Sequence, residues 1–337
     1  MIHSRPITLT ALAVLASTLF AASLRGQATV DVTIEEWQVP NRAYPHDPAV
    51  APDGSAWYTG QRNNTLGRLD VRTGQFREYP LPTQGSGPHG LVADRDGNIW
   101  YTGNAAGLIG KLDPRTGKVT EYPMPDPAAR DPHTPLFDQQ GTLWFTVQGG
   151  NFVGKLDPQT GKVTLKQAPT RGSLPYGMVI SSKGVPFFDL FGTNKLGSID
   201  PKTMEITEYT LPQGARPRRI AIDSNDVVWY TDYDRGFLGR FDPRTKEVKE
   251  YRSPGGPNSR PYGMTATSDG AIWYSESEVE PNTLVRFDPR TATFQKWPIP
   301  SGGGVVRHMV AAPNGELWLA CSGVGKIARV RIRRLSS

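Results

Sequence analysis

The feature that most constrains the fold of this chain is an internal repeat of 42 to 45 residues. One aromatic residue recurs at a fixed place in each unit, and successive spacings are 43, 44, 43, 42, 44 and 45 residues. The seven aromatic residues are Trp57, Trp100, Trp144, Phe187, Trp229, Trp273 and Trp318. Seven such units fill nearly all of the 337 residues, so the sequence predicts a repeat protein.

Each unit has the pattern of four short strands joined by tight turns. An Asp-Gly or Asn-Gly pair, as at 53–54, 96–97 and 314–315, supplies the positive φ of a two-residue hairpin before the aromatic strand. An Asp-Pro-x-Thr turn, as at 113–116, follows the third strand. The chain has 36 Gly and 30 Pro, about a fifth of its residues, and many of them recur at fixed turn and strand-end positions of the repeat. Four-stranded units of this length predict an all-β fold, a seven-bladed β-propeller.

The two ends of the chain favour a closed ring over an open solenoid. Residues 32–40 have the pattern of a fourth strand with no unit before it, and the seventh unit ends at its third strand, residues 326–331. An open stack would need a polar cap at each end and would leave its sheet edges exposed. We therefore expect the N-terminal strand to complete the last blade.

The N-terminus predicts export. Residues 1–28 combine Arg5, an apolar stretch over 7–24 and a small-residue site at 26–28, as in a secretory signal peptide. An uncleaved membrane anchor is the alternative. Cleavage lowers the formal charge from +6 to +4 and leaves one propeller domain, residues 29–337, expected to be a periplasmic or secreted monomer. Scattered basic residues argue against nucleic-acid binding, and a lone Cys321 cannot form an internal disulfide.

Aligning the repeats predicts where a functional site lies, because the first strand of each propeller blade lines the central channel. The residues eleven positions before the seven aromatics are all polar: His46, His89, His133, Tyr176, Arg218, Tyr262 and Arg307. His308 is one residue out of register, and a β-bulge would bring it into the ring in place of Arg307. Imidazoles here are candidate general bases or metal ligands. Alternatively, they satisfy strand-end backbone groups around a wet channel.

The second strands add two carboxylates to the same face. Asp232 and Glu276 follow the aromatic residue by three positions in adjacent repeats, and Asp131 precedes one of the Pro-His pairs. Asp232 and Glu276 are candidate ligands of a hard cation such as Mg²⁺, or partners of Arg218 and Arg307 in a structural network. The seven aromatics themselves are expected to pack between neighbouring blades.

The repeat over residues 88–125, PHGLVADRDGNIWYTGNAAGLIGKLDPRTGKVTEYPMP, resembles the streptogramin B lyase (virginiamycin B lyase) family, and the resemblance covers about residues 32–330. It implies elimination at the ester bond of a cyclic depsipeptide, without water, with channel histidines as acid or base and Mg²⁺ polarising the substrate. The family's catalytic histidines correspond to Tyr262 and Arg307 in this chain. The Thr-Glu pair of the family is matched by residues 275–276.

Three functions follow from these observations. The first is a metal-assisted carbon–oxygen lyase acting on a cyclic peptide or other small molecule. The others are a gluconolactonase-like hydrolase and a non-catalytic binding or sensor propeller. For the lyase, the candidate catalytic residues are His46, His89, His133 and His308. The candidate substrate-binding residues are Tyr176, Arg218, Tyr262 and Arg307, and the candidate Mg²⁺ ligands are Asp232 and Glu276.

Overall fold

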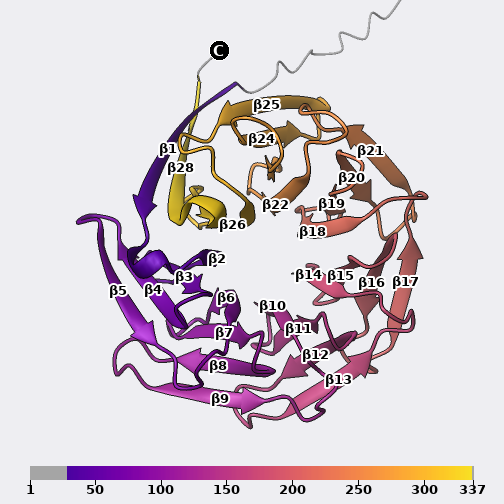
Figure 1. The fold of residues 1–337 in the computed structure, drawn as a ribbon. Helices are drawn as coiled ribbons and strands as arrows, with labels where there is room; N and C mark the ends of the chain where they lie inside the picture. Colours follow the sequence, from indigo (N-terminus) through magenta and orange to yellow (C-terminus); the bar gives the residue numbers. More distant parts are fainter. Residues whose placement is uncertain (1–28, 336–337) are drawn as a thin grey trace, which may run out of the picture.

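The computed structural model describes residues 29–335 as a ring of seven four-stranded antiparallel sheets, which confirms the predicted propeller (Figure 1). Two short 3-10 helices, η1 (Pro40–Arg42) and η2 (Ser322–Val324), are the only helical segments in that range. None of the described helices has the length and hydrophobicity needed to cross a bilayer. The predicted signal peptide, residues 1–28, lies outside the described residues.

In six blades the strands follow chain order outward from the channel, and in the seventh the N-terminal strand is added outside the last three strands of the chain (Figure 1). The innermost strands are β2 (Pro45–Val50), β6 (Pro88–Ala93), β10 (Pro132–Phe137), β14 (Pro175–Ile180), β18 (Pro217–Ile222), β22 (Pro261–Ala266) and β26 (Val306–Ala311). The second strands are β3 (Ala56–Gly60), β7 (Ile99–Gly103), β11 (Leu143–Val147), β15 (Pro186–Leu190), β19 (Val228–Asp232), β23 (Ile272–Glu276) and β27 (Leu317–Cys321).

The outermost strand of each blade has one face exposed to solvent. The third strands are β4 (Thr65–Asp70), β8 (Leu108–Leu112), β12 (Phe152–Leu156), β16 (Lys195–Ile199), β20 (Phe237–Phe241), β24 (Thr283–Asp288) and β28 (Lys326–Arg334). The outermost strands are β5 (Gln75–Pro80), β9 (Val119–Pro123), β13 (Val163–Gln167), β17 (Ile206–Thr210), β21 (Val248–Arg252), β25 (Thr293–Pro298) and β1 (Val30–Gln38). The outermost strands alternate or mix exposed and half-buried residues, because only one of their faces meets the blade interior.

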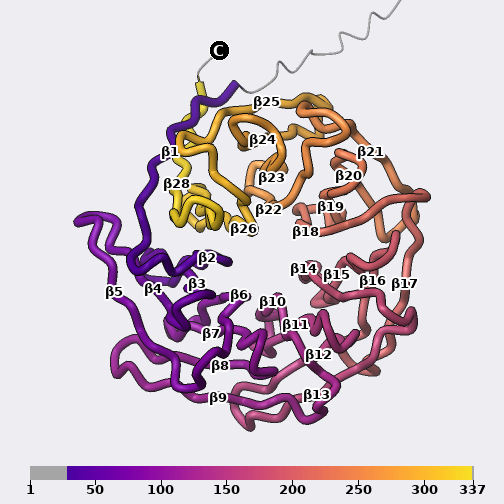
Figure 2. Tube along the Cα trace, in the orientation of Figure 1, coloured from indigo at the N-terminus to yellow at the C-terminus, as the bar shows by residue number. Residues whose placement is uncertain are grey.

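The ring closes as the termini predict. Strand β1 pairs antiparallel with β28 over nine residue pairs, from Val30 opposite Arg334 to Gln38 opposite Lys326. The two strands run side by side in the Cα trace (Figure 2). Strand β1 begins and ends two residues earlier than expected, and β28 continues three residues further than expected, to Arg334. The chain ends therefore complete one sheet, and β28 is paired on both sides instead of forming an open edge.

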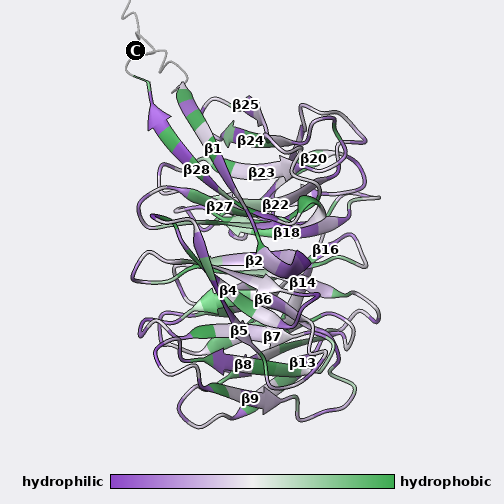
Figure 3. Ribbon diagram, turned by 60° about the vertical axis from the view of Figure 1, so that its left-hand side comes forward, coloured by the Kyte–Doolittle hydropathy of each residue, from purple (hydrophilic) through white to green (hydrophobic). Residues whose placement is uncertain are grey.

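The recurring aromatics form the core between blades, as expected. All seven are at most 6% exposed, and each joins a cluster of apolar residues from two neighbouring sheets. Several indole N–H groups donate to a side chain of the preceding turn, as Trp100 does to Asp94 at 2.9 Å. Hydrophilic residues are frequent in the connecting loops (Figure 3). Cys321 is a buried free thiol of this core.

A β-bulge occurs at the start of every innermost strand. In β2 the pairing steps from Pro45 opposite Gly60 to Pro48 opposite Tyr58, so one extra residue is inserted. The same shift recurs in the other six blades. Bulges re-aim side chains near functional sites. Here the two residues inside each bulge give the channel two successive rings of side chains.

Candidate functional site

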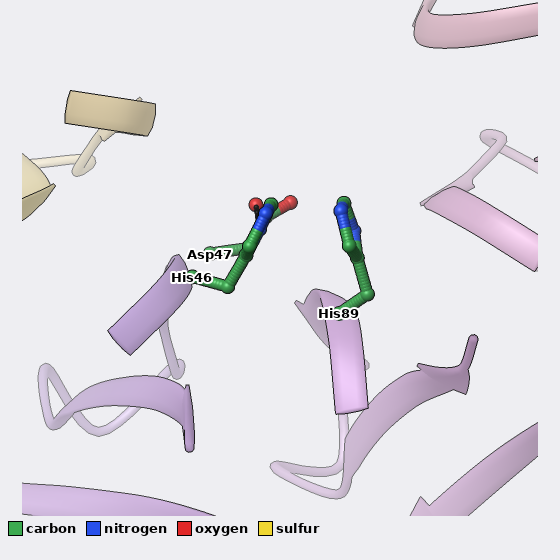
Figure 4. A group of neighbouring side chains, drawn as sticks. All are labelled: His46, Asp47 and His89. Carbon is green, nitrogen blue, oxygen red and sulfur yellow. Dashed lines mark hydrogen bonds and ion pairs between the residues drawn. The ribbon is translucent and has the colours of Figure 1, made fainter. Parts of the chain in front are cut away.

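The first ring contains the residue that opens each bulge, the set predicted from the repeat alignment. The three histidines of this ring form a continuous stack of tilted rings. The ring centroids of His46 and His89 are 3.6 Å apart at an interplanar angle of 41°, and those of His89 and His133 are 3.9 Å apart at 48°. Tyr176 extends the stack at 3.8 Å from His133. Figure 4 shows the imidazoles of His46 and His89 side by side, projecting from neighbouring blades into the channel.

The histidines of the channel are held neutral. Burial lowers the pKa of His46 to about 4, and nearby Arg307 and Arg219 act in the same direction while Asp47 opposes them. Burial lowers the pKa of His308 to about 3 and holds those of His89 and His133 well below the usual value. A neutral imidazole accepts a proton at one nitrogen, so the stack is a row of potential bases.

The second ring contains the other bulge residue: Asp47, Gly90, Thr134, Gly177, Arg219, Gly263 and His308. Arg219, which is 1% exposed, crosses the channel and holds three other blades. Its guanidinium donates to Asp47 Oδ1 at 3.1 Å, to Thr134 Oγ1 at 3.1 Å and to the carbonyl of Arg307 at 3.1 Å. His308 lies in this second ring, and Arg307 lies in the first ring. The bulge therefore brings His308 to the channel without displacing Arg307.

The two rings are joined by side-chain contacts. His46 Nδ1 lies 2.9 Å from Asp47 Oδ1, and His133 Nδ1 lies 2.9 Å from Thr134 Oγ1. Burial by itself would raise the pKa of Asp47, but Arg219, His308 and His46 hold it well below its usual range. The Asp47 carboxylate therefore fixes the His46 tautomer that leaves Nε2 as the acceptor.

The opposite side of the first ring is aromatic and cationic. The hydroxyls of Tyr176 and Tyr262 are hydrogen-bonded to each other. The guanidinium carbon of Arg218 lies 3.9 Å from the Tyr262 ring centroid and 4.1 Å from that of Tyr233. Arg307 donates to the Tyr44 hydroxyl at 2.6 Å. All four predicted substrate-binding residues thus lie together at the channel.

The candidate Mg²⁺ ligands are already bonded within their own blades. Asp232 accepts from Arg235 Nε at 2.6 Å and from the Arg216 backbone at 3.1 Å. Glu276 is fully buried and accepts from the Ser253 hydroxyl at 2.5 Å, the Gly255 N–H at 2.6 Å and the Thr283 hydroxyl at 2.6 Å. Asp232 pairs with Arg235 and not with Arg218 or Arg307. Carboxylates with this many donors fit Mg²⁺ poorly.

A second group has the spacing of a metal site. One ligand atom from each of His46, Asp47 and His89 lies within 4.8 Å of the others, and all three residues are buried. Two imidazoles and one carboxylate suit a transition metal and not Mg²⁺, which prefers oxygen ligands. Asp47 Oδ1 already accepts hydrogen bonds from His46 and Arg219, however, and the Arg219 charge repels a cation. The donor set therefore fits a resident divalent metal poorly.

The innermost strands are tied together by a hydroxyl two residues after the aromatic. Thr59 donates to the carbonyl of His89 at 2.8 Å, and Thr102 donates to that of His133 at 2.9 Å. Asp189 occupies this position in the fourth blade. Its Oδ1 accepts from the Gly177 N–H at 2.8 Å, whereas its buried Oδ2 has no partner among the described residues. Burial raises the pKa of Asp189 well above its usual value, so the carboxyl is a neutral acid.

Replacing Asp189 with asparagine is expected to stabilise the protein increasingly as the pH rises. The native carboxyl retains a proton that the unfolded chain loses above about pH 4, so the wild-type stability falls with rising pH. Asparagine does not titrate, and the advantage of Asp189→Asn should grow by about 1.4 kcal/mol per pH unit until the native carboxyl ionises. Urea denaturation between pH 5 and pH 8 measures it.

The exposed turn residue Asp70 is the matched control for that experiment. Its carboxylate accepts from the backbone N–H groups of Arg72 and Thr73, which hold its pKa below the usual value. Asp70→Asn should therefore lower the free energy of unfolding at neutral pH, whereas Asp189→Asn should raise it. A stability difference for Asp189→Asn that does not change with pH would show that Asp189 is ionised in the folded protein.

The alignment of single positions missed Asp47, Thr134, Arg219 and Asp189. Two signals in the sequence point to them. In three blades the residue after the first-ring position is Gly. A side chain would collide with the neighbouring strand there: a Cβ added to Gly90 would lie 2.1 Å from the carbonyl oxygen of His133. The other four blades replace this glycine with a larger polar residue: Asp47, Thr134, Arg219 or His308. The position two residues after the aromatic is Thr or Ser in five blades and Ala320 in the seventh, and Asp189 is its one charged residue.

Fold and site together define a seven-bladed propeller with a histidine- and arginine-lined channel. A family model described as the virginiamycin B lyase family matches residues 5–191 and 170–334. The chain therefore belongs to the virginiamycin B lyase family. The comparison with curated proteins found no match.

Solved structures agree with this assignment. A streptogramin B lyase structure is 27% identical with a TM-score of 0.81, covering 90% of this chain and 98% of that one. Virginiamycin B lyase from Staphylococcus aureus is 26% identical with a TM-score of 0.80, covering 91% and 100%. A catalytically inactive variant of the S. aureus lyase, solved with quinupristin, is 25% identical over the same shares, also with a TM-score of 0.80.

Proposed function

We propose that this protein is an exported carbon–oxygen lyase that eliminates at an ester bond of a cyclic depsipeptide or a related substrate. The observation that carries the proposal is the neutral stack of His46, His89 and His133 in the channel, with Asp47 fixing the tautomer of His46. A base oriented by a carboxylate is the arrangement that proton abstraction needs. Membership of the lyase family supports the same reaction class.

In the proposed reaction His46 Nε2 takes the proton on the carbon next to a carbonyl. The electrons of that C–H bond form a carbon–carbon double bond, and the bond from the neighbouring carbon to the ester oxygen breaks. The ester oxygen leaves as part of a carboxylate, so no water is consumed and the ring opens without a change in mass. His89, stacked 3.6 Å from His46 and with its buried Nδ1 unpartnered among the described residues, accepts a hydrogen bond from the substrate.

The other side of the channel stabilises the negative charge that develops on the carbonyl oxygen. The hydroxyl donors preorganised there are those of the Tyr176–Tyr262 pair and of Tyr44, which accepts a hydrogen bond from Arg307. Because neither the Asp232 and Glu276 carboxylates nor the His46 cluster fits Mg²⁺, the proposed steps use only side chains of this chain.

Mass spectrometry of a cyclic depsipeptide incubated with the purified protein tests the proposal. The expected product has the mass of the substrate and gains a double bond that absorbs in the ultraviolet. A product heavier by one water would establish a hydrolase instead. No product from a panel of cyclic and linear depsipeptides would favour a binding or sensor propeller.

The pH dependence of the reaction is a further expected result. The active form of His46 is the neutral base, so the rate should fall only when the pH approaches its pKa of about 4. An ordinary histidine base would give a fall in rate near about pH 6.5. The value of kcat/KM, which reports the free enzyme, should therefore stay level from pH 8 down to about pH 5. A decline with a midpoint near 6.5 would show that the channel histidines are solvated.

A further inference from the structure

The charges of the channel do not balance. Three guanidinium groups, those of Arg218, Arg219 and Arg307, reach it, and arginine stays protonated at any physiological pH. Asp47 is the single carboxylate that pairs with one of them, at 3.1 Å from Arg219 Nη2. Within residues 29–335, no carboxylate lies within 4.0 Å of the Arg218 or Arg307 guanidinium.

The other acidic groups around the channel mouth are committed elsewhere. Asp232 pairs with Arg235, and Asp234 pairs with Arg216 and Arg260. Glu276 is fully buried and accepts three hydrogen bonds in its own blade. Asp131 accepts a hydrogen bond from the Asn104 amide and forms no ion pair with Arg218 or Arg307, and burial raises the pKa of Asp189 well above its usual value. Two positive charges therefore remain without a counter-charge from residues 29–335.

The two unpaired guanidinium groups are also held in place with unused donors. Arg218 packs its flat faces on Tyr262 at 3.9 Å and Tyr233 at 4.1 Å, which leaves the N–H edge of the group for a ligand. Among the described residues, the buried Nε atoms of Arg218 and Arg307 have no hydrogen-bond partner. Buried donors are ordinarily satisfied, and a rigid guanidinium edge matches two oxygens of a carboxylate.

We propose that Arg218 and Arg307 form an oxyanion-binding subsite and that the substrate of this protein carries a carboxylate. This inference deepens the proposed function and rests on it in one respect, that the bound anion is a substrate. Anion binding at the subsite can be tested without turnover. The seated anion would also offset the charges of Arg307 and Arg219 that act on His46. Bound substrate would then make His46 a stronger base than it is in the free protein.

Direct binding of simple anions to the full-length protein tests the subsite. Acetate, sulfate and the neutral isostere acetamide are titrated at constant ionic strength, with binding followed by calorimetry and by the thermal unfolding midpoint. Acetate or sulfate is expected to bind saturably and acetamide is not. Preference for acetate would assign a carboxylate, and preference for sulfate would assign a tetrahedral anion from the same donors.

Two arginine variants and a matched control identify the site. Arg218→Gln and Arg307→Gln should each weaken anion binding by about tenfold or more, because a charge-assisted hydrogen bond is lost. Arg218→Lys, which keeps the charge, should restore part of it and guards against a folding defect in the glutamine variant. Arg216→Gln is the control, since Arg216 also stacks on an aromatic ring, 4.2 Å from Phe191, but is paired with Asp234.

The outcomes separate the two proposals. Saturable anion binding that Arg218→Gln and Arg307→Gln abolish supports the subsite even if no depsipeptide is cleaved. Stabilisation by sulfate that is equal in all variants is a general salt effect and overturns the subsite. Failure of acetate and sulfate to bind, together with cleavage of an uncharged depsipeptide, overturns the subsite while leaving the lyase intact.

Discussion

Replacing Arg219 with methionine is expected to lower the free energy of unfolding by about 3–5 kcal/mol. The substitution keeps an unbranched side chain close in length to the apolar stem of arginine, but it removes the only cation that pairs with Asp47 among the described residues. Both side chains are 1% exposed. A buried carboxylate without its partner carries a large desolvation cost. The bonds from Arg219 to Thr134 and to the Arg307 carbonyl are lost as well. Urea denaturation at neutral pH measures the difference.

A surface pair and a double variant complete the test. Arg68 lies 2.9 Å from Asp53, but the two side chains are 40% and 58% exposed, so Arg68→Met should cost less than about 1 kcal/mol. Changing Asp47 to leucine together with Arg219→Met should recover much of the loss, because it removes the unpaired buried charge. Equal losses for Arg68→Met and Arg219→Met would mean that the channel is hydrated and that Arg219 does not bridge the blades.

The second large effect concerns catalysis. If the proposed lyase reaction is observed, His46→Gln is expected to lower kcat by about 10²- to 10⁴-fold, the usual contribution of a positioned general base. Glutamine preserves a hydrogen-bonding group of similar reach but cannot take up a proton at neutral pH. KM should change much less than kcat, since proton transfer occurs only in the transition state. Steady-state kinetics on the depsipeptide that gives product provide both constants.

Lys118→Gln is the control for this substitution, since Lys118 is exposed and lies at the outer edge of the second blade. It should leave kcat and KM unchanged. His89→Gln should reduce activity as well, through loss of the neighbouring acceptor. If His46→Gln keeps full activity while His89→Gln loses it, the base is His89 and the His46–Asp47 pair serves only to stabilise the fold.

Much of this architecture is encoded locally. The spacing of the aromatics gives seven blades because one large side chain per unit must pack between adjacent sheets. The incomplete units at the two ends predict the pairing of β1 with β28, since a strand without a sheet and a sheet without its last strand satisfy each other. The first ring of the channel follows from the same alignment, and all seven of its members lie where the repeat predicts.

The repeat pattern is therefore enough to predict the ring, its closure and the residues that face the channel. Which of these residues interact, and in which charge state, depends on the folded ring. Arg219 and Asp47 are 172 residues apart and meet across the channel, a contact that no local pattern specifies. The neutrality of the histidines and of Asp189 likewise comes from burial by several blades at once. The periodicity of the sequence encodes the pairing of strands within a blade. The contacts across the channel and the charge states of its side chains depend on where all seven blades place those side chains.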